Sequence, residues 1–306
     1  MLKENRIVAS LRAMLRLVFG VIILVVGGCV SLEADLSGWH SRIGIKLAED
    51  IKKAEGELVL NRLLMQKPIV GGTIAFVNAH PHLAGIVIDL VGVNGNSGCG
   101  GSLITSNRVL TAAHCWYDGR SLAWRFTVVL GSAYLFFGGE RIPTSQVVLH
   151  PAYSAKTLAN DIAMIYLPRH VSFTSEIQPV ALAGSAFIGH DFVGHWVVAA
   201  GYGRYSDATN PTMMTTVRDV NLKVISLTNC RGIYGNIVLD SNICTSGSGG
   251  VGICRGDSGG PLTINIGNRP VLLGVSSFVA QNGCELGFPS AFARVPYYMN
   301  WIMKHV

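Results

Sequence analysis

Residues 69–306 are predicted to form an all-β fold. Short apolar runs recur every 8–20 residues, separated by glycine, proline, asparagine and serine, a pattern typical of strands joined by turns. The chain has 36 glycines, 49% hydrophobic residues and only 14% charged residues, which favours a turn-rich protein with a large core. Because neither a strand–helix alternation nor an internal repeat occurs, the pattern leaves two architectures open: antiparallel barrels or a β-sandwich.

Seven of these runs are distinct enough to be predicted as individual strands. They are Gly85–Val93, Phe126–Leu130, Gln146–Leu149, Ile162–Leu167, Trp196–Ala200, Val217–Val224 and Val271–Ser276. The end of the chain differs from them. Tyr298, Trp301 and Ile302 are spaced i, i+3, i+4, which predicts a short C-terminal helix packed on the body of the protein.

Residues 1–31 resemble a secretory signal peptide. Four basic residues within positions 1–16 precede 16 uncharged residues, Leu17–Leu32. Small residues suited to signal peptidase lie near the end of this uncharged stretch. A membrane anchor is the alternative, but the uncharged stretch is shorter than the roughly 20 residues that span a bilayer. We therefore expect a secreted, extracellular protein without stable membrane association. Met14 is a second candidate for the translation start.

Residues 32–68 are predicted to be a removable pro-segment. They are rich in charge, and apolar residues at helical spacing predict an amphipathic helix within Leu47–Leu64; an unstructured linker is the alternative. The composition changes at Pro68-Ile69, so the mature domain is expected to be residues 69–306.

The charge distribution argues against a nucleic-acid partner. The net charge of +6 divides into +3 for residues 1–68, with 10 basic and 7 acidic residues, and +3 for residues 69–306, with 14 and 11. No long basic run occurs after the leader, so an electrostatic footprint for nucleic acid is missing.

The cysteines favour a disulfide-bonded extracellular domain. Of seven cysteines, Cys29 lies in the leader and six remain, which in a secreted chain implies three disulfides. The sequence contains no CxxC or HExxH spacing, so we expect neither a metal site nor another cofactor.

A candidate nucleophile lies in the stretch Gly252–Pro261. Ser258 is placed in a glycine-rich turn, Asp257 precedes it and Cys254 lies four residues upstream. Small residues around one hydroxyl can direct backbone N–H groups at an oxygen that becomes negative during acyl transfer. An ordinary turn, in which the aspartate binds its own backbone, is the alternative.

A base and an orienting carboxylate are also present. His114 follows the apolar run Leu110–Ala113, and imidazole is the natural general base near neutral pH; a buried core histidine is the alternative. Asp161 stands at the head of the apolar strand Ile162–Leu167, where an unpaired buried carboxylate would be costly. A turn residue is the alternative for Asp161.

Four motifs, in order and at familiar spacing, together resemble the chymotrypsin family of secreted serine endopeptidases. They are Ile69–Gly72, Thr111–Cys115, Asn160–Ala163 and Gly256–Pro261. The stretch Cys99–Ile104 through Cys115–Gly119 is most similar to digestive chymotrypsin- and elastase-like enzymes of moths and butterflies. The resemblance implies two six-stranded antiparallel β-barrels, expected to act as a monomer, with the catalytic residues meeting in the cleft between them.

The resemblance also implies roles for individual residues. In the mechanism known for this family, Ser258 would attack the peptide carbonyl, His114 would take up its proton and Asp161 would hold the imidazole. The N–H groups of Gly256 and Ser258 would form the oxyanion hole. Ser277 matches the family's serine that binds the triad aspartate, with a plain strand serine as the alternative.

The family further implies three disulfides and an activation step. The expected pairs are Cys99–Cys115, Cys230–Cys244 and Cys254–Cys284. Cleavage would free Ile69, whose ammonium would pair with Asp257 and shape the oxyanion hole. This sequence has Pro68 where the family usually has a basic residue, so a trypsin-like activator should cleave it poorly.

The resemblance places Gly252 at the base of the primary specificity pocket. An aspartate there would select Lys or Arg, so a preference for uncharged residues is expected. The predicted walls are Ser277, Phe278, Val279 and Ser290. Chymotrypsin-like enzymes carry glycine in place of Val279 and Ser290, so these side chains favour small or medium aliphatic residues.

The partners implied are protein and peptide substrates, whose backbone would add as a strand to residues 277–279. Protein protease inhibitors are further candidate partners. Arg255, at the pocket lip, is expected to favour acidic groups nearby, or else to be a solvated arginine. The alternative function is a catalytically silent homologue serving as a binding or regulatory module, which Pro68 alone favours.

Overall fold

The computed structural model describes residues 38–61, 73–76, 78–204, 206–207 and 216–306. The predicted signal peptide and the predicted cleavage site Pro68-Ile69 lie outside the described residues. Within the described ranges, no helix is long and apolar enough to cross a membrane.

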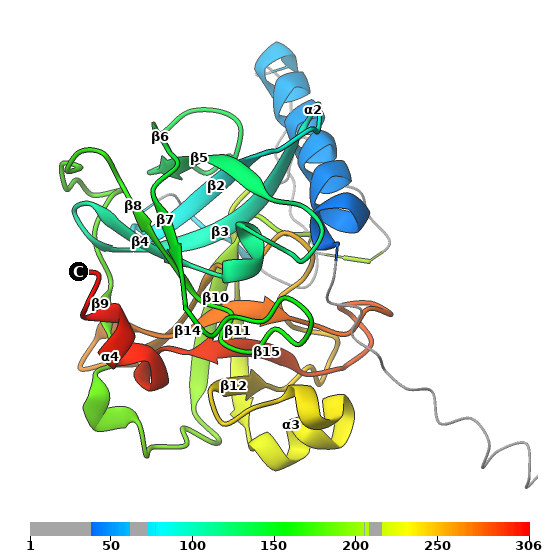
Figure 1. Cartoon of the computed structure of the whole chain (residues 1–306), viewed down its shortest axis with the longest axis vertical. Helices are drawn as coiled ribbons and strands as arrows, with labels where there is room; N and C mark the ends of the chain where they lie inside the picture. The colour runs from blue at the N-terminus through cyan, green and yellow to red at the C-terminus, as the bar shows by residue number, and fades with distance from the viewer. Residues whose placement is uncertain (1–37, 62–72, 77, 205, 208–215) are drawn as a thin grey trace, which may run out of the picture. The chain divides into compact units, whose positions relative to one another are not determined.

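The first sheet is a closed antiparallel barrel. Its strands are β2 (Leu83–Leu90), β3 (Asn96–Thr105), β4 (Arg108–Thr111), β5 (Ala123–Leu130), β6 (Glu140–Thr144), β7 (Val147–Leu149) and β8 (Ala163–Tyr166). They are ordered β6-β5-β2-β3-β4-β8-β7. Only two residues separate β6 from β7, so the two form one bent strand that pairs with β5 at one end and β8 at the other. That strand closes the sheet into a six-stranded ring; its strands are labelled in Figure 1.

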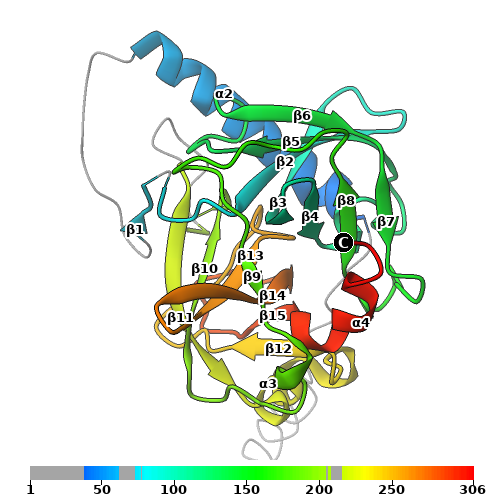
Figure 2. The ribbon, with the colours of Figure 1, turned by 90° about the vertical axis from the view of Figure 1, so that its left-hand side faces the viewer.

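The second sheet is also a barrel. Its strands are β1 (Thr73–Ile74), β9 (Ala181–Leu182), β10 (Trp196–Gly201), β11 (Arg218–Ile225), β12 (Asn242–Thr245), β13 (Pro261–Ile266), β14 (Arg269–Phe278) and β15 (Ser290–Arg294). Six of them run β11-β10-β13-β14-β15-β12, and pairing of β11 with β12 closes the ring (Figure 2). Closure removes exposed strand edges. The prediction of two six-stranded barrels is confirmed, and all seven predicted runs fall on strands.

The core of each barrel is filled by side chains from alternate strand positions. In the first barrel Ile86, Phe126 and Ile165 are fully buried, and in the second Leu262 and Phe292 are. Such close-packed interiors fix the loops at the barrel ends.

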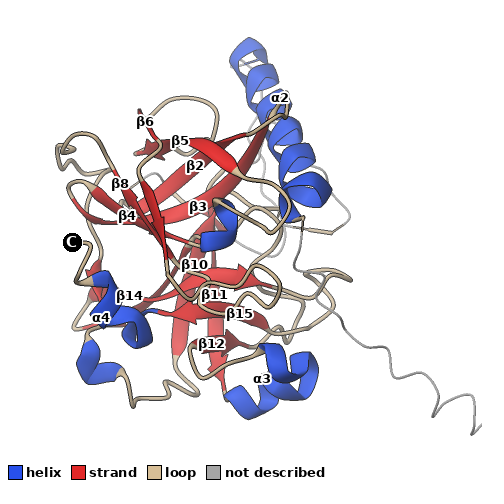
Figure 3. Ribbon diagram, in the orientation of Figure 1, coloured by secondary structure: helices blue, strands red, loops and turns tan. Residues whose placement is uncertain are grey.

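Helices lie outside the two sheets (Figure 3). The regular ones are α2 (Ile45–Asn61), α3 (Leu227–Tyr234) and α4 (Met299–Ile302), with 3-10 turns η2 (Ala113–Cys115), η3 (Ser185–Phe187), η4 (Gly235–Ile237) and η5 (Val295–Tyr298). The predicted C-terminal helix is confirmed as η5 and α4, because Tyr298 and Ile302 are both buried against the first barrel's core.

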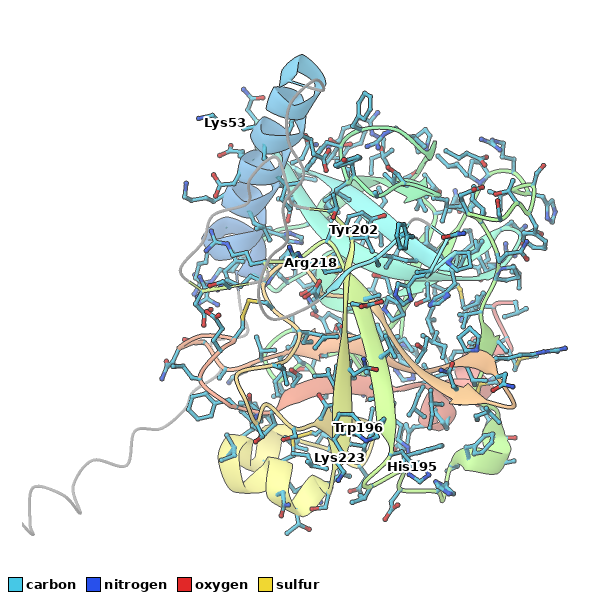
Figure 4. The ribbon with its side chains drawn as sticks, turned by 180° about the vertical axis from the view of Figure 1, so that it is seen from behind. Lys53, His195, Trp196, Tyr202, Arg218 and Lys223 are labelled. Carbon is cyan, nitrogen blue, oxygen red and sulfur yellow. A yellow bond between two sulfur atoms is a disulfide. The ribbon has the colours of Figure 1, made fainter. Side chains whose placement is uncertain are left out.

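The N-terminal segment, residues 38–61, is ordered. A π-helical turn, η1 (His40–Gly44), leads into α2, which begins two residues before the predicted helix. The linker alternative is therefore wrong. One face of α2 is buried through Leu47 and Ile51, which join an apolar cluster drawn from both barrels; each such side chain stabilises the fold by about 1.5–3 kcal/mol. Lys53 lies on the exposed face (Figure 4).

Candidate active site

His114 lies at the end of the first barrel, on the short turn η2 that follows β4. A disulfide between Cys99 of β3 and Cys115 ties this turn to the neighbouring strand. The imidazole is therefore carried by a rigid element, and only 3% of its side chain is exposed.

Asp161 contacts His114 through both carboxylate oxygens. Oδ1 accepts the backbone N–H of His114 at 2.9 Å, and Oδ2 lies 2.8 Å from His114 Nδ1. Ser277 Oγ, on β14 of the second barrel, donates to the same Oδ2 at 2.6 Å. This 1% exposed carboxylate is thus fully hydrogen-bonded, which offsets the cost of burying its charge.

The loop carrying Ser258 is attached to both barrels. The Ser258 carbonyl accepts the N–H of Gly100 on β3 at 2.7 Å, and the N–H of Gly259 donates to Ser276 O on β14 at 2.8 Å. Gly259 has φ +78°, and a Cβ there would lie 2.5 Å from the Gly100 carbonyl oxygen. Only glycine permits this approach, so the motif's glycine positions the serine.

His114 and Ser258 line one cleft of about 290 Å³. His114 Nδ1 is engaged by Asp161, whereas Nε2 has no hydrogen-bond partner among the described residues. A histidine oriented by a carboxylate on one nitrogen and unpartnered on the other has the arrangement that a general base requires.

Asp257 is half-buried and lies outside the cleft, on the second cavity. Its two carboxylate oxygens accept the N–H groups of Gly203 and Cys254, each at 2.9 Å. Burial raises the pKa of this carboxyl to about 6, although the two hydrogen bonds act in the opposite direction. Next to it Gly256 has φ +100°, and the Arg255 carbonyl accepts the N–H of Arg204 at 2.9 Å.

The structure forms the three disulfides that the resemblance implies. Besides Cys99–Cys115, they are Cys230–Cys244 and Cys254–Cys284. The last one braces the serine loop through Cys254, four residues before Ser258.

The predicted specificity residues fall into two groups. Ser277, Phe278, Val279 and Arg255 line the cleft. Arg255 Nη2 also donates to the Gln281 carbonyl at 3.2 Å, so the guanidinium is tied across the loop.

Gly252 and Ser290 do not line this cleft. They lie against each other, since a Cβ at Gly252 would be 2.8 Å from Ser290 Oγ, and Ser290 accepts the N–H of Ile253 at 3.2 Å. Gly252 instead lines a second cavity with Asp257. The wall of the cleft at this depth is formed by Ile253 and Cys254.

Sequence reasoning missed several residues of the cleft, among them Ile253, Cys254, Ala280 and Gln281 beside the predicted positions and four residues from elsewhere in the chain. Trp39, Arg42 and Ile43 come from the N-terminal segment, and Leu158 from the loop before Asp161. The sequence held one signal for the three residues of the N-terminal segment: an amphipathic helix with an apolar face needs a surface to cover.

Two groups of possible metal ligands occur among the described residues. They are Cys99, His114 and Cys115, and Asp207, Cys254 and Cys284. All four cysteines are engaged in disulfides, so neither group offers the thiolates that bind metals.

The fold and this constellation define a chymotrypsin-fold serine endopeptidase. The trypsin family model matches residues 69–302, and the chain belongs to that family. It is 39% identical to brachyurin of Leptuca pugilator, over 76% of this chain and 96% of the relative. Collagenase of Hypoderma lineatum is 35% identical, over 79% and 88%. A solved structure titled HL collagenase matches with a TM-score of 0.69 and 34% identity, covering 78% and 98%.

The predicted similarity to moth and butterfly enzymes has only loose support. Trypsin, alkaline B of Manduca sexta is 33% identical over 78% of this chain and 90% of the relative, a lower identity than that of the crustacean brachyurin. All these relatives carry names of proteases, so the alternative of a catalytically silent homologue has no support among them.

Proposed function

We propose that residues 69–306 hydrolyse peptide bonds in proteins with His114 as general base, Asp161 as its orienting partner and Ser258 as nucleophile. The convergence of these residues, through the hydrogen bonds of Asp161 to both His114 and Ser277, carries the proposal. The N–H groups of Gly256 and Ser258 stabilise the oxyanion that forms in the transition state.

Activation requires cleavage before Ile69. Residues 1–31 direct the chain into the secretory pathway, residues 32–68 are the pro-segment, and the released ammonium of Ile69 pairs with Asp257. Support comes from the family match, which begins at residue 69, and from the half-buried carboxylate of Asp257, whose pKa is raised to about 6. A desolvated carboxylate with a raised pKa gains strongly from a cationic partner.

The substrates are dietary proteins cleaved after small or medium aliphatic residues. Phe278 and Val279 form an apolar wall of the cleft, and among the described residues no carboxylate lines it to select Lys or Arg. Two matches named collagenase make fibrillar collagen a substrate to include in any test. Protein protease inhibitors are expected to bind the same cleft.

A fluorophosphonate, which labels only an activated serine, tests the catalytic assignment. The full chain is cut before Ile69 and treated with the reagent, and the labelled peptide is identified by mass spectrometry. Labelling at Ser258 is expected, with Ser258→Ala as the matched control. An unlabelled Ser258 in a cut, folded chain would contradict the proposal.

Val279→Gly tests the specificity assignment. Removing this side chain from the wall enlarges the cleft. Cleavage after Phe or Tyr should therefore rise about tenfold relative to cleavage after Ala, Val or Leu, which is the effect expected of a few methylene groups in a binding pocket. A peptide library cleaved by both enzymes gives the ratio. If the unchanged enzyme already prefers Phe and Tyr, the aliphatic preference is wrong.

A further inference from the structure

We propose that the N-terminal segment is an intramolecular inhibitor that occupies the leaving-group side of the substrate cleft and still binds there after cleavage. The inference rests on the proposed function and adds a second layer of control to it. The segment lies outside the residues that match the trypsin family. It contacts the rest of the chain at three places along its length, two of which are at the site.

The first contact is made at the histidine. The rings of Trp39 and His114 pack edge to face with their centroids 5.6 Å apart. The backbone N–H of His40 donates to Asp118 Oδ2 at 2.8 Å, and His40 Nδ1 lies 2.8 Å from Ser97 Oγ on β3. These bonds fix the tryptophan against the proposed base.

Trp39 stands where the leaving half of a substrate would pass. The acyl half pairs with the strand at residues 277–279, so the leaving half must lie on the opposite side of Ser258. His114 hands a proton to the leaving amine, and therefore has to face that half. Trp39 packs on His114 and lines the same cleft as Ser258, so a bound peptide and the indole compete for one space.

The second contact is made at the serine loop. A Cβ at Gly256 would lie 2.7 Å from Leu47 Cδ2, which places this buried leucine directly on the loop of the proposed oxyanion hole. One turn along α2, Asp50 Oδ2 is 3.7 Å from Arg204 Nη2. The N–H of Arg204 in turn binds the Arg255 carbonyl.

The third contact anchors the helix. Glu55 is 4% exposed, and its two oxygens accept the N–H groups of Leu135 at 2.6 Å and Phe136 at 2.5 Å. Ile51 and Ala54 are buried beside it. A buried carboxylate that accepts hydrogen bonds from two backbone N–H groups indicates a specific binding site for the helix. A segment that served only as a linker would not need such a site.

No disulfide would retain the segment once the chain is cut. The six cysteines from Cys99 to Cys284 pair with one another, and none lies in the segment. After cleavage the complex is held by noncovalent contacts alone, so its occupancy must depend on protein concentration.

The experiment separates this inhibition from the activation step. Leu64→Asp, Met65→Asp, Gln66→Asp, Lys67→Asp and Pro68→Lys, combined in the full chain, allow enteropeptidase to cut before Ile69. The cut protein is assayed over a dilution series with an internally quenched peptide that extends on both sides of the scissile bond. Three versions are compared: the unchanged segment, Leu47→Asp, and Lys53→Ala on the exposed face as matched control.

The specific activity of the cut enzyme with the unchanged segment should rise about tenfold or more on dilution. The cut enzyme with Lys53→Ala should show the same rise. Leu47→Asp should be fully active at every concentration, because burying a carboxylate in place of a leucine weakens binding by at least that factor. A synthetic peptide of residues 38–61 should inhibit the diluted enzyme, and the same peptide with Trp39→Ala should inhibit less. The peptide arm keeps the test valid if Leu47→Asp impairs folding of the precursor.

Fluorophosphonate labelling distinguishes the two possible failures. If Ser258 is not labelled in any diluted sample, the proposed function fails. If Ser258 is labelled and the rate is equal at all dilutions, in all versions and with added peptide, the enzyme assignment stands and the inhibitory role of the segment is overturned.

Discussion

His114 and Ser258 lie on two sides of one cleft, and their surroundings are assembled to different degrees in the uncut chain. On the histidine side, Asp161 binds the His114 N–H and imidazole and receives the Ser277 hydroxyl. On the serine side, Asp257 is held by two backbone N–H groups of its surroundings, and Leu47 of the N-terminal segment lies on Gly256.

This difference indicates which half of the site depends on activation. The proposed base and its proposed orienting carboxylate require only that the two barrels fold and meet. The serine loop carries the half-buried carboxylate of Asp257, whose pKa is raised to about 6 by desolvation. A cationic partner would offset the free-energy cost of keeping this carboxylate charged. We therefore expect the activating cleavage before Ile69 to act on the serine side, and the predictions below probe each side in turn.

The largest effect is expected on the assembled side, from Asp161→Asn. An amide in this position would favour the wrong imidazole tautomer, and kcat of the cut enzyme should fall by about 10⁴-fold, the size known for this change in the family's triad. Steady-state kinetics on a peptide substrate measure it. A loss of less than about tenfold would show that another group orients His114.

Asp257→Asn should affect the cut and uncut chains in opposite directions. In the cut enzyme the ammonium of Ile69 would lack its counter-ion, so kcat/KM should fall by about a hundredfold or more, as when one partner of a buried pair is removed.

In the uncut chain the same change should raise stability at pH 8. The folded pKa of about 6 lies above the ordinary 3.8, so the folded state loses stability as pH rises from about 4 to 6 and does not regain it above. Removing the charge should recover up to about 3 kcal/mol at pH 8, and nothing below pH 4. Urea unfolding of both chains at the two pH values gives the difference; a variant that is less stable at pH 8 would contradict it.

Ser277→Ala tests how much the second barrel contributes to the histidine side. Loss of a hydrogen bond to a buried carboxylate costs about 1.5–3 kcal/mol, so kcat should fall by roughly ten- to a hundredfold. KM should remain the same, because the hydroxyl contacts Asp161 and not the substrate. An equal change in KM would place Ser277 in substrate binding instead.

The smallest net effect is expected for the pH dependence of segment binding, in which two groups act in opposite directions. Burial raises the pKa of Glu55 to about 7, against the hydrogen bonds from Phe136 and Leu135 and the charge of Arg141. Tyr202 also faces this carboxylate. Ionisation of Glu55 therefore costs more free energy in the bound segment than in the free one. The affinity of the segment should weaken as pH rises from about 4.5 to 7.

His40 acts in the opposite direction. Burial lowers the pKa of this imidazole to about 4, with Asp118 raising it and His114 lowering it further, so binding should strengthen as pH rises from 4 to 6.5. The two trends oppose each other in the unchanged segment. Glu55→Gln removes one of them, so its affinity should increase more steeply with pH over this range than that of the unchanged segment.

Fluorescence anisotropy of labelled 38–61 peptides on the cut enzyme, measured from pH 4 to 7, tests this prediction. Groups common to both peptides and to the enzyme contribute equally, so only the difference between the two profiles is interpreted. Parallel profiles would mean that Glu55 does not titrate in this range when bound.

The sequence determined the parts of the molecule that depend on local pattern. Strand positions followed from short apolar runs between turn residues, because side-chain alternation and turn chemistry are local properties. The role of the glycines around Ser258 could be predicted for the same reason. They meet a backbone requirement, seen at Gly259, that no other residue satisfies. The six cysteines also predicted three disulfides, although their pairing came only with the family resemblance.

Only the tertiary structure decided what lies across the cleft. A one-dimensional pattern showed that α2 has an apolar face but carried no information on which surface that face would cover, since long-range packing is set by shape and burial in three dimensions. Nor did it show that Gly252 and Ser290 lie behind the cleft wall. The placement of Trp39 on His114 and of Leu47 on Gly256 arises because the junction of the two barrels offers an apolar surface that the helix buries.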